Sequence, residues 1–290
     1  MSKNVLITGG LGQLGRKLYY DLNSSYNVIN SSRNGQSNTL KLDVADSNNM
    51  STTIGKISPD IILNCSSFNN VDNCEIEKDS ARSVIVGGIR NLIKFSKKKC
   101  RIIHISSDYI FDGKKGDYLE DDAPSPLNYY GRLKLEAENL LRSSNRDYVI
   151  IRCGTIFSHD LKCKSNFFGW VYNNLKAKKN INVVKDQISC PTPVELISKF
   201  INIIMPLNSN GIFNLGIAES FSRFDFAMKI CKAFDFDEKL IHPVSTKDLS
   251  QKAIRPKNTT LNIAKINTEL DIDIYSLSYY IDKLKDVIIE

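Results

Sequence analysis

The first strand-like stretch of the chain reads NVLITGGLGQLG, from Asn4 to Gly15. Its opening residues are mostly apolar, as in a buried strand, and the glycines behind them are spaced GxxGxxG where a helical pattern begins. A dinucleotide site needs this order, because the turn must be tight and the backbone must approach a pyrophosphate closely. The free N–H groups at the start of the helix then face the phosphates. Gly9, Gly12 and Gly15 therefore predict a dinucleotide-binding loop.

Strand-like and helical stretches alternate through the first half of the chain. This alternation predicts a doubly wound parallel sheet with helices on both faces. The nearly continuous apolar character of the strand-like runs fits strands that are buried on both sides. These runs are 4–8, 26–30, 59–64, 101–106 and 147–152.

Beyond about residue 155 the pattern loosens into helices separated by short strands such as NINVV and GIFNLG. The expected fold class is α/β, with an NAD(P)-binding Rossmann domain over residues 1–155 and a smaller α/β substrate-binding domain over 156–290. The boundary is soft, and we expect the two parts to be interleaved. The helical stretches of the second half lie near 166–178, 193–205, 222–234 and 275–287.

The end of the second strand-like run indicates which dinucleotide binds. An NAD site usually presents an acidic residue there to the ribose hydroxyls, whereas this chain reads VINSSRNG and offers Arg33. A guanidinium suits a 2′-phosphate, so NADPH is favoured and NADH stays open as the alternative. Further on, in LDVAD, Asp43 is placed to accept a hydrogen bond from the adenine amino group, although a turn aspartate would read the same way.

Composition excludes several classes of function. Hydrophobic content of 42% and charged content of 24% over 290 residues are those of a globular protein. The net charge of +7 comes from scattered lysines without a nucleic-acid motif, so no nucleic-acid partner is expected, although the positive field attracts anionic small ligands. The seven cysteines form no CxxC pair and the three histidines are scattered, so no metal site is expected. Lacking a leader or a long apolar run, the chain is expected in the reducing cytoplasm, away from membranes.

A tyrosine and a lysine four residues apart stand at the start of a helix-forming stretch, NYYGRLKLEAENLL, residues 128–141. Residues at this spacing share one helix face, so Tyr130 and Lys134 project side by side. A tyrosine normally titrates near a pKa of about 10, and an adjacent ammonium favours the phenolate and lowers that pKa. The pair can therefore serve as a proton donor, but the same spacing also occurs in ordinary helices.

The order of several segments along the chain decides between these two interpretations. From residue 3 to about residue 285 the chain resembles the extended short-chain dehydrogenase/reductases, and among them the dTDP-4-dehydrorhamnose reductases. This resemblance favours the catalytic interpretation of Tyr130 and Lys134. The segments that carry it are TGGLGQLG, PDIILNCSSFNNVD, ISSDYIFDG, SPLNYYGRLK, VVKDQISCPT and IRPKNTTLNIAKI.

The resemblance implies NADPH-dependent reduction of the C4 ketone of a 4-keto-6-deoxy sugar nucleotide, for surface polysaccharide synthesis. The implied catalytic residues are Ser107, Tyr130 and Lys134; Tyr129 is the other tyrosine, but only Tyr130 stands four residues before a lysine. In this mechanism a hydride from the nicotinamide reaches the carbonyl carbon while negative charge develops on its oxygen. Ser107 would hydrogen-bond that oxygen and Tyr130 would protonate it. Lys134 would lower the pKa of the tyrosine and hold the nicotinamide ribose.

The resemblance also implies further contacts to the cofactor and to a nucleotide-sugar substrate. Arg255 would face the diphosphate, although a plain surface role suits it equally well. A homodimer stays open. The implied cofactor contacts are Gly12, Gln13 and Leu14 at the phosphates, Asp43 and Val44 at the adenine, Ser66 and Ser67 below the cofactor, and Tyr130 and Lys134; the implied substrate contacts are Ser107, Asp108 and Arg255.

Two departures from the family pattern keep alternatives open. Ile85 stands where many relatives have an asparagine that supports a water-linked proton path to the lysine, and Thr155 replaces a frequent tryptophan beside the sugar nucleotide. The alternatives are a reductase of another 4-keto sugar nucleotide, a sugar-nucleotide epimerase or dehydratase, and a non-catalytic cofactor-binding subunit. Dehydratases carry an Asp-Glu pair after the catalytic threonine, whereas Asp108 and Tyr109 follow Ser107 here, which favours a reductase.

Overall fold

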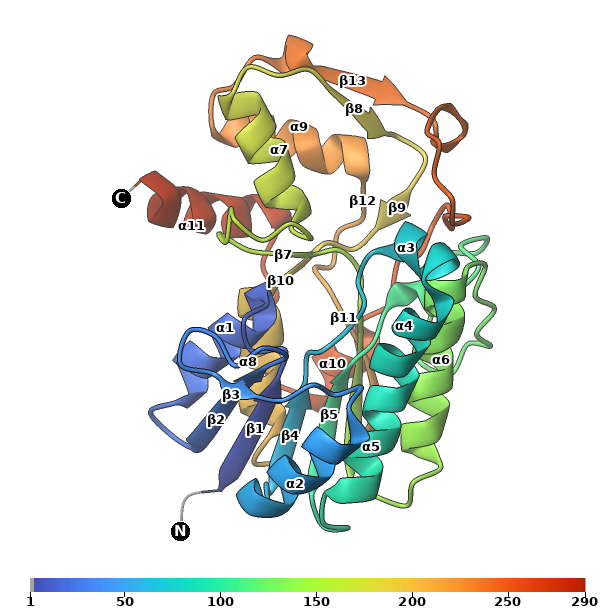
Figure 1. Cartoon of the computed structure of the whole chain (residues 1–290). Helices are drawn as coiled ribbons and strands as arrows, with labels where there is room; N and C mark the ends of the chain where they lie inside the picture. Colours follow the sequence, from blue (N-terminus) through green and yellow to red (C-terminus); the bar gives the residue numbers. More distant parts are fainter. Residues whose placement is uncertain (1–2, 290) are drawn as a thin grey trace.

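The structure, a computed structural model, describes residues 3–289. Its centre is a seven-stranded sheet with the order β11-β6-β5-β4-β1-β2-β3, in which every neighbouring pair is parallel (Figure 1). The predicted α/β class with a doubly wound sheet is confirmed. The strands are β1 Asn4–Thr8, β2 Asn27–Ser32, β3 Leu40–Lys41, β4 Ile61–Asn64, β5 Arg101–Ile105, β6 Tyr148–Cys153 and β11 Gly211–Leu215.

Helices cover both faces of this sheet because successive strand residues point to opposite sides. Val5 and Ile7 belong to one apolar cluster, whereas Leu6 between them belongs to the other. The first cluster is covered by α1 and α8, and the second by α2, α5 and α6 (Figure 1). These helices are α1 Gln13–Leu22, α8 Val194–Ile204, α2 Ser47–Ile57, α5 Gly88–Phe95 and α6 Tyr129–Arg142.

The strand order reverses between β1 and β4, which pair directly with Val5 opposite Ile61. From β1 the chain runs outward to β2 and β3 on one side, and then returns to β4 and β5 on the other. Open α/β sheets bind ligands in the crevice beyond the carboxyl ends of the strands at such a reversal. The fold therefore directs attention to the loops that follow β1 and β4.

A second layer lies beyond the carboxyl ends of the sheet strands (Figure 1). It contains α7 Phe167–Lys176, α9 Arg223–Ala233, α11 Leu277–Ile289 and the parallel pair of β8 Ile181–Val184 with β13 Ile241–Val244. Short strand pairs connect it to the rest: β7 Ile156–Phe157 with β10 Thr192–Pro193, and β9 Ile188–Ser189 with β12 Phe221–Ser222.

Residues from the second half of the chain also build the central sheet. The strand β11 pairs with β6 along its whole length, and α8 packs against α1. The helix α10, Ala264–Glu269, contacts β11 from outside. A division of the chain at residue 155 would separate β11 from its partner β6. Any two-domain description must therefore assign residues 194–215, which contain α8 and β11, to the domain of the central sheet.

The connection from β4 to α5 is irregular. It runs through α3 Val71–Ile76, α4 Lys78–Arg82 and a π-helical turn, Ser83–Gly87. Such wide turns are frequent at functional sites. Ile85 lies in this turn and is only 2% exposed. Among residues 3–289, no helix has the length and apolar character to cross a bilayer.

Candidate active site

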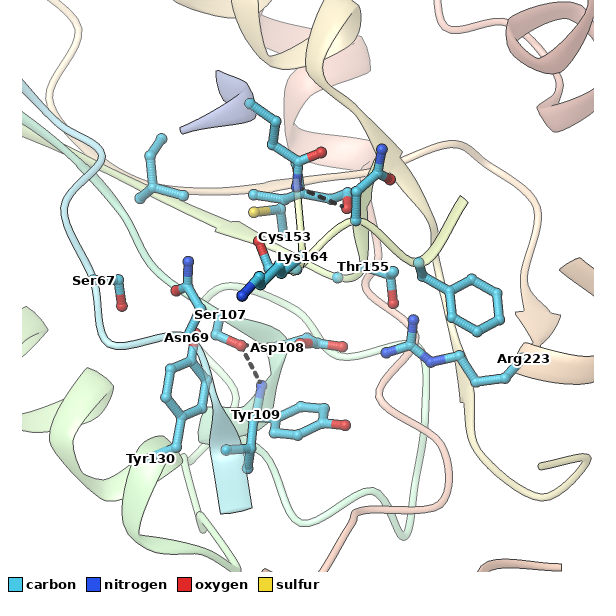
Figure 2. A pocket seen from close by; sticks show the side chains of 18 of the residues that line it. Ser67, Asn69, Ser107, Asp108, Tyr109, Tyr130, Cys153, Thr155, Lys164 and Arg223 are labelled. Atoms are coloured by element: carbon cyan, nitrogen blue, oxygen red, sulfur yellow. Dashed lines mark hydrogen bonds between the residues drawn. The ribbon is translucent and has the colours of Figure 1, made fainter. Parts of the chain in front are cut away.

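A cavity of about 590 Å³ lies between the carboxyl ends of the sheet strands and the second layer. Its lining includes the glycine-rich loop, the turn after β5, the start of α6 and residues of α7, β8 and α9. Figure 2 shows Ser107 and Tyr130 together on one side of this cavity and Arg223 across it. The three predicted catalytic residues, Ser107, Tyr130 and Lys134, all line the cavity.

The turn after β5 holds Ser107 in a fixed orientation. Ser107 is the N-cap of a 3₁₀ turn, Asp108–Ile110, and its Oγ accepts a hydrogen bond from the Tyr109 backbone N–H at 3.2 Å (Figure 2). The same Oγ donates to Asp108 Oδ1 at 3.1 Å. Capping holds the short Ser107 side chain in one orientation at the carboxyl end of a buried strand. Its hydroxyl therefore faces the cavity.

The helix α6 presents Tyr130 from the neighbouring wall. Asn128 caps this helix, since its Oδ1 accepts from the Gly131 N–H at 2.8 Å. A Cβ on Gly131 would lie 2.2 Å from the Tyr109 carbonyl oxygen, so only glycine allows the helix to approach the serine turn this closely. The tyrosine rings at 109 and 130 meet edge to face, with centroids 6.2 Å apart. The glycine after Tyr130 thus brings the phenol beside Ser107.

Lys134 lies one turn further along α6 and is buried. Its Nζ donates a 2.6 Å hydrogen bond to the Ile105 carbonyl and lies 6.0 Å from the centroid of the Tyr130 ring. Burial lowers the pKa of Lys134 to about 8, an effect that Cys153 and Glu138 oppose. The lysine is therefore still largely charged at neutral pH, next to the tyrosine.

The predicted effect of Lys134 on Tyr130 was wrong in its net direction. Burial raises the pKa of Tyr130 well above its ordinary value, and the neighbouring Ser107 hydroxyl opposes this rise only in part. The lysine ammonium is directed to the Ile105 carbonyl, so it does not offset the loss of hydration around the phenol. Tyr130 is therefore fully protonated at neutral pH, as a proton donor in a reduction must be.

Asp108 is a buried carboxyl held by two hydroxyls. Thr259 Oγ1 donates to its Oδ2 at 2.5 Å, and Ser107 donates to its Oδ1. Burial raises the pKa of Asp108 to about 6, and the bond from Thr259 opposes the shift. Thr259 comes from the segment after Arg255, so the far end of the chain fixes this carboxyl. We assigned no role to Thr259 from the sequence.

A second cavity, of about 350 Å³, adjoins the first, because Gly9, Gly12 and Ser67 line both. Asp43 Oδ1 accepts a hydrogen bond from the Ala45 backbone N–H at 3.0 Å, which closes a local turn. Asp43 also lines this second cavity. Arg33 is exposed and forms no ion pair with any residue between 3 and 289. The predicted cofactor residues that line this second cavity are Gly9, Gly12, Arg33, Asp43, Val44, Ser66 and Ser67.

The glycine-rich loop joins the two cavities. Gly9 has a φ of +70°, and a Cβ there would lie 2.9 Å from the Ser66 backbone nitrogen, so the loop passes closely over the end of β4. Gln13, at the start of α1, donates to the Ile156 carbonyl at 3.2 Å and accepts from Ser158 Oγ at 2.9 Å. Gln13 therefore ties this loop to the β7 segment, while Leu14 and Gly15 line the larger cavity.

Arg255 lines the larger cavity, but its guanidinium is already partnered. Nη2 lies 3.0 Å from Asp72 Oδ2, Nη1 donates to the Ala253 carbonyl, and the side chain is only 9% exposed. Asp72 also accepts from the Ala253 N–H at 2.9 Å, which ties α3 to the segment around Arg255. Arg255 thus has a structural contact in addition to its place at the cavity wall, and it is not a plain surface residue.

An ion pair that we did not predict lies beside the predicted catalytic residues on α6. Arg152 Nη2 lies 2.8 Å from Glu138 Oε2, with side-chain exposures of 1% and 0%. Ser106 Oγ donates to Glu138 Oε1 at 2.5 Å, and Arg152 Nη1 donates to the Glu120 carbonyl. Glu138 stands four residues after Lys134 on α6. This spacing in the sequence indicates that Glu138 lies on the same helix face as Lys134.

The two departures from the family pattern are both visible here. Ile85 packs in the apolar cluster between α5, α6 and the sheet, so no polar group stands at that position. Thr155 lines the larger cavity, and its Oγ1 is buried with no hydrogen-bond partner among the described residues. Within residues 3–289, no three His, Cys, Asp or Glu side chains are grouped closely enough to hold a metal ion.

The sequence is similar to known proteins over nearly its whole length. The family model described as RmlD substrate binding domain matches residues 3–288. The dTDP-4-dehydrorhamnose reductase of Aggregatibacter actinomycetemcomitans is 32% identical over 289 residues, covering 92% of this chain and 93% of that protein. The beta subunit of mouse methionine adenosyltransferase 2 is 28% identical over 276 residues, covering 92% of this chain and 82% of its own.

Solved structures extend the match to three dimensions. A dTDP-4-dehydrorhamnose reductase from Bacillus anthracis, crystallised in complex with NADP, superposes with a TM-score of 0.91 at 27% identity, covering 99% of this chain and 100% of that one. The sequence match and the fold match therefore span the same residues, including both cavities. The chain belongs to the RmlD substrate binding domain family, the dTDP-4-dehydrorhamnose reductase family of the extended short-chain dehydrogenase/reductases.

Proposed function

We propose that this protein uses NADPH to reduce the C4 ketone of a 4-keto-6-deoxy sugar nucleotide, with dTDP-4-dehydro-L-rhamnose as the first substrate to test and surface polysaccharide synthesis as its purpose. The observation that carries the proposal is the grouping of Ser107, Tyr130 and Lys134 in one cavity that adjoins the glycine-rich loop. Family membership supports it, since the relatives include reductases of this substrate class.

The residues present fit a dinucleotide across the two cavities. Gly9 leaves room that a Cβ would fill, and Ser67 Oγ is buried without a partner among the described residues. Arg33 offers an exposed guanidinium beside the smaller cavity, where a 2′-phosphate would lie. Asp43 Oδ2 remains for the adenine amino group, because Oδ1 accepts from Ala45. When bound, NADPH supplies the hydride.

Side chains of this protein then stabilise and neutralise the negative charge that develops on the ketone oxygen. The Ser107 hydroxyl turns from Asp108 Oδ1 to donate its one hydrogen bond to that oxygen, and Tyr130 donates the proton that completes the alcohol. Oriented donors at a developing oxyanion lower a barrier by about 2.7 to 4 kcal/mol for one well-placed group. The positive charge of Lys134, with Nζ 6.0 Å from the centroid of the Tyr130 ring, favours the phenolate that remains on Tyr130 and offsets part of the cost of burying it.

The direct test incubates the purified protein with NADPH and a panel of 4-keto-6-deoxy sugar nucleotides and identifies the product. Steady oxidation of NADPH with formation of the C4 alcohol would establish a reductase and name its sugar. Tight cofactor binding without turnover on any member of the panel would refute the proposal. An epimerase would instead convert a sugar nucleotide without net consumption of NADPH.

Arg33→Ala is expected to weaken NADPH binding by about tenfold or more while changing NADH binding little. A hydrogen bond to a charged group contributes about 1.5–3 kcal/mol, and only NADPH carries the 2′-phosphate that this guanidinium would meet. Calorimetric titration of both cofactors measures the difference, with the exposed Arg90→Ala on α5 as the charge-matched control. Equal weakening of the two cofactors would remove the argument for this contact.

The pH dependence of kcat/KM is expected to be bell-shaped, with limbs near pH 6 and pH 8. Asp108 has a raised pKa of about 6, so its carboxylate is lost as the pH falls below that value. Lys134 has a lowered pKa of about 8, so its charge is lost as the pH rises above it. Asp108→Asn should flatten the acid limb and leave the alkaline one. An acid limb that survives in this variant would assign it to another group.

A second candidate is a non-catalytic cofactor-binding subunit. Two observations favour it: the similarity to the mouse methionine adenosyltransferase beta subunit, and Ile85 at the position where an asparagine is expected. Against it stands the grouping of Ser107, Tyr130 and Lys134, which a binding role does not need. Turnover in the sugar-nucleotide panel would exclude this candidate.

A further inference from the structure

An aromatic surface lies at the end of the larger cavity formed by α7. Trp170, the single tryptophan of the chain, lines this cavity and remains 42% exposed. Its ring stacks on Phe167, with centroids 5.8 Å apart and an angle of 29° between the planes. Phe167 is in turn supported by Phe226, at 5.4 Å between centroids. One face of the pair is therefore fixed by the core, while the indole remains open to the cavity.

A cation connects this surface to the catalytic residues. The Arg223 guanidinium lies over the Phe167 ring, 5.2 Å from its centroid. On its other side Arg223 faces Asp108 and Tyr109, which line the same cavity, and its positive charge opposes the rise in pKa that burial causes in both groups. Figure 2 shows Arg223 directed into the cavity opposite Ser107 and Asp108. Along the wall of the cavity, Ser107 and Asp108, the Arg223 cation and the aromatic pair therefore lie in that order.

This order matches the parts of a nucleotide sugar. The sugar belongs at Ser107 and Tyr130, the diphosphate requires a cation, and the base requires a flat apolar surface. Thr155 offers no such surface, although it lines the same cavity. The exposed Lys164 adds a second positive charge to the wall near α7.

We propose that Trp170, supported by Phe167, is the stacking surface for the base of the substrate nucleotide, and that Arg223 faces its diphosphate. This inference rests on the proposed function, since it takes the sugar end to lie at Tyr130. It places the recognition of the base on α7 instead of on the segment after β6, where Thr155 stands.

The fluorescence of the single tryptophan provides a direct test. The protein is first saturated with NADP⁺, so that the adenosine cavity is filled, and is then titrated with dTDP, with UDP, and with inorganic pyrophosphate as a probe without a base. Stacking of a base on the indole should quench the emission with either nucleotide, and pyrophosphate should leave it nearly unchanged. Unchanged emission with both nucleotides would overturn the inference.

Variants provide a second measurement by calorimetry. Trp170→Ala should weaken dTDP binding by about tenfold, the loss of one base-stacking contact, while Trp170→Phe retains most of the affinity. Tyr20, an exposed aromatic residue of α1, lines neither cavity, so Tyr20→Ala serves as the control. Wild-type affinity in Trp170→Ala would also overturn the inference.

The outcomes separate this inference from the proposed function. Reduction of a 4-keto sugar nucleotide with no quenching by dTDP or UDP would defeat the role of Trp170 and leave the reductase. Quenching by a nucleotide without turnover on the whole panel would leave the base site and defeat the reductase. A urea midpoint equal to that of the wild type shows that the alanine variant is folded.

Discussion

Tyr130→Phe is expected to lower kcat by about 10²- to 10⁴-fold, the usual contribution of a positioned general acid. The change removes only the phenol oxygen, so the packing of α6 against the serine turn is kept. The NADPH dissociation constant should change little, because Lys134 and the glycine-rich loop remain. The consumption of NADPH with a saturating 4-keto sugar nucleotide measures kcat, and calorimetry measures the cofactor affinity.

The adjacent tyrosine is the matched control. Tyr129 starts the same helix, but it lines neither cavity, and its ring lies near the cations of Lys78 and Arg132. Tyr129→Phe should therefore keep kcat within about twofold, since the change removes one hydroxyl from a half-buried side chain that lines neither cavity. Near-normal turnover in Tyr130→Phe, or an equal loss in both variants, would refute the role of Tyr130 as the acid.

Glu138→Ala is expected to lower the free energy of unfolding by about 3–5 kcal/mol, because it leaves the buried Arg152 guanidinium without its counter-ion. Ser106 also loses the acceptor for its hydroxyl, next to Ser107. The change should appear as a lower urea midpoint. Glu138→Gln, which keeps one oxygen acceptor, should lose less.

Glu136 on the same helix provides the comparison for this prediction. It pairs with Arg82 at the surface, where both side chains are well exposed and solvent screens their charges. Glu136→Ala should therefore leave the urea midpoint close to that of the wild type. If Glu138→Ala were as stable as Glu136→Ala, burial would not determine the contribution of the inner pair.

Much of the fold could be predicted because it depends on local pattern. The run expected at 101–106 is β5, and the helical stretches near 166–178 and 193–205 are α7 and α8. Apolar runs and capping residues act over a few neighbouring positions, so one sequence contains them. The segment GIFNLG was expected as a short strand of the second half, yet it is β11 of the central sheet. A strand's sequence does not specify its partner when many residues separate the two.

The sequence by itself determined the glycine-rich turn before α1 and the placement of Tyr130 and Lys134 on one face of α6, because glycine geometry and helix periodicity depend on residues close together in the chain. Only the tertiary structure decided the sign of the pKa shift at Tyr130, the contact of Thr259 with Asp108, and the placement of Trp170 at the cavity. Burial and long-range contacts depend on which distant segments meet, and hydration is removed only when they pack together.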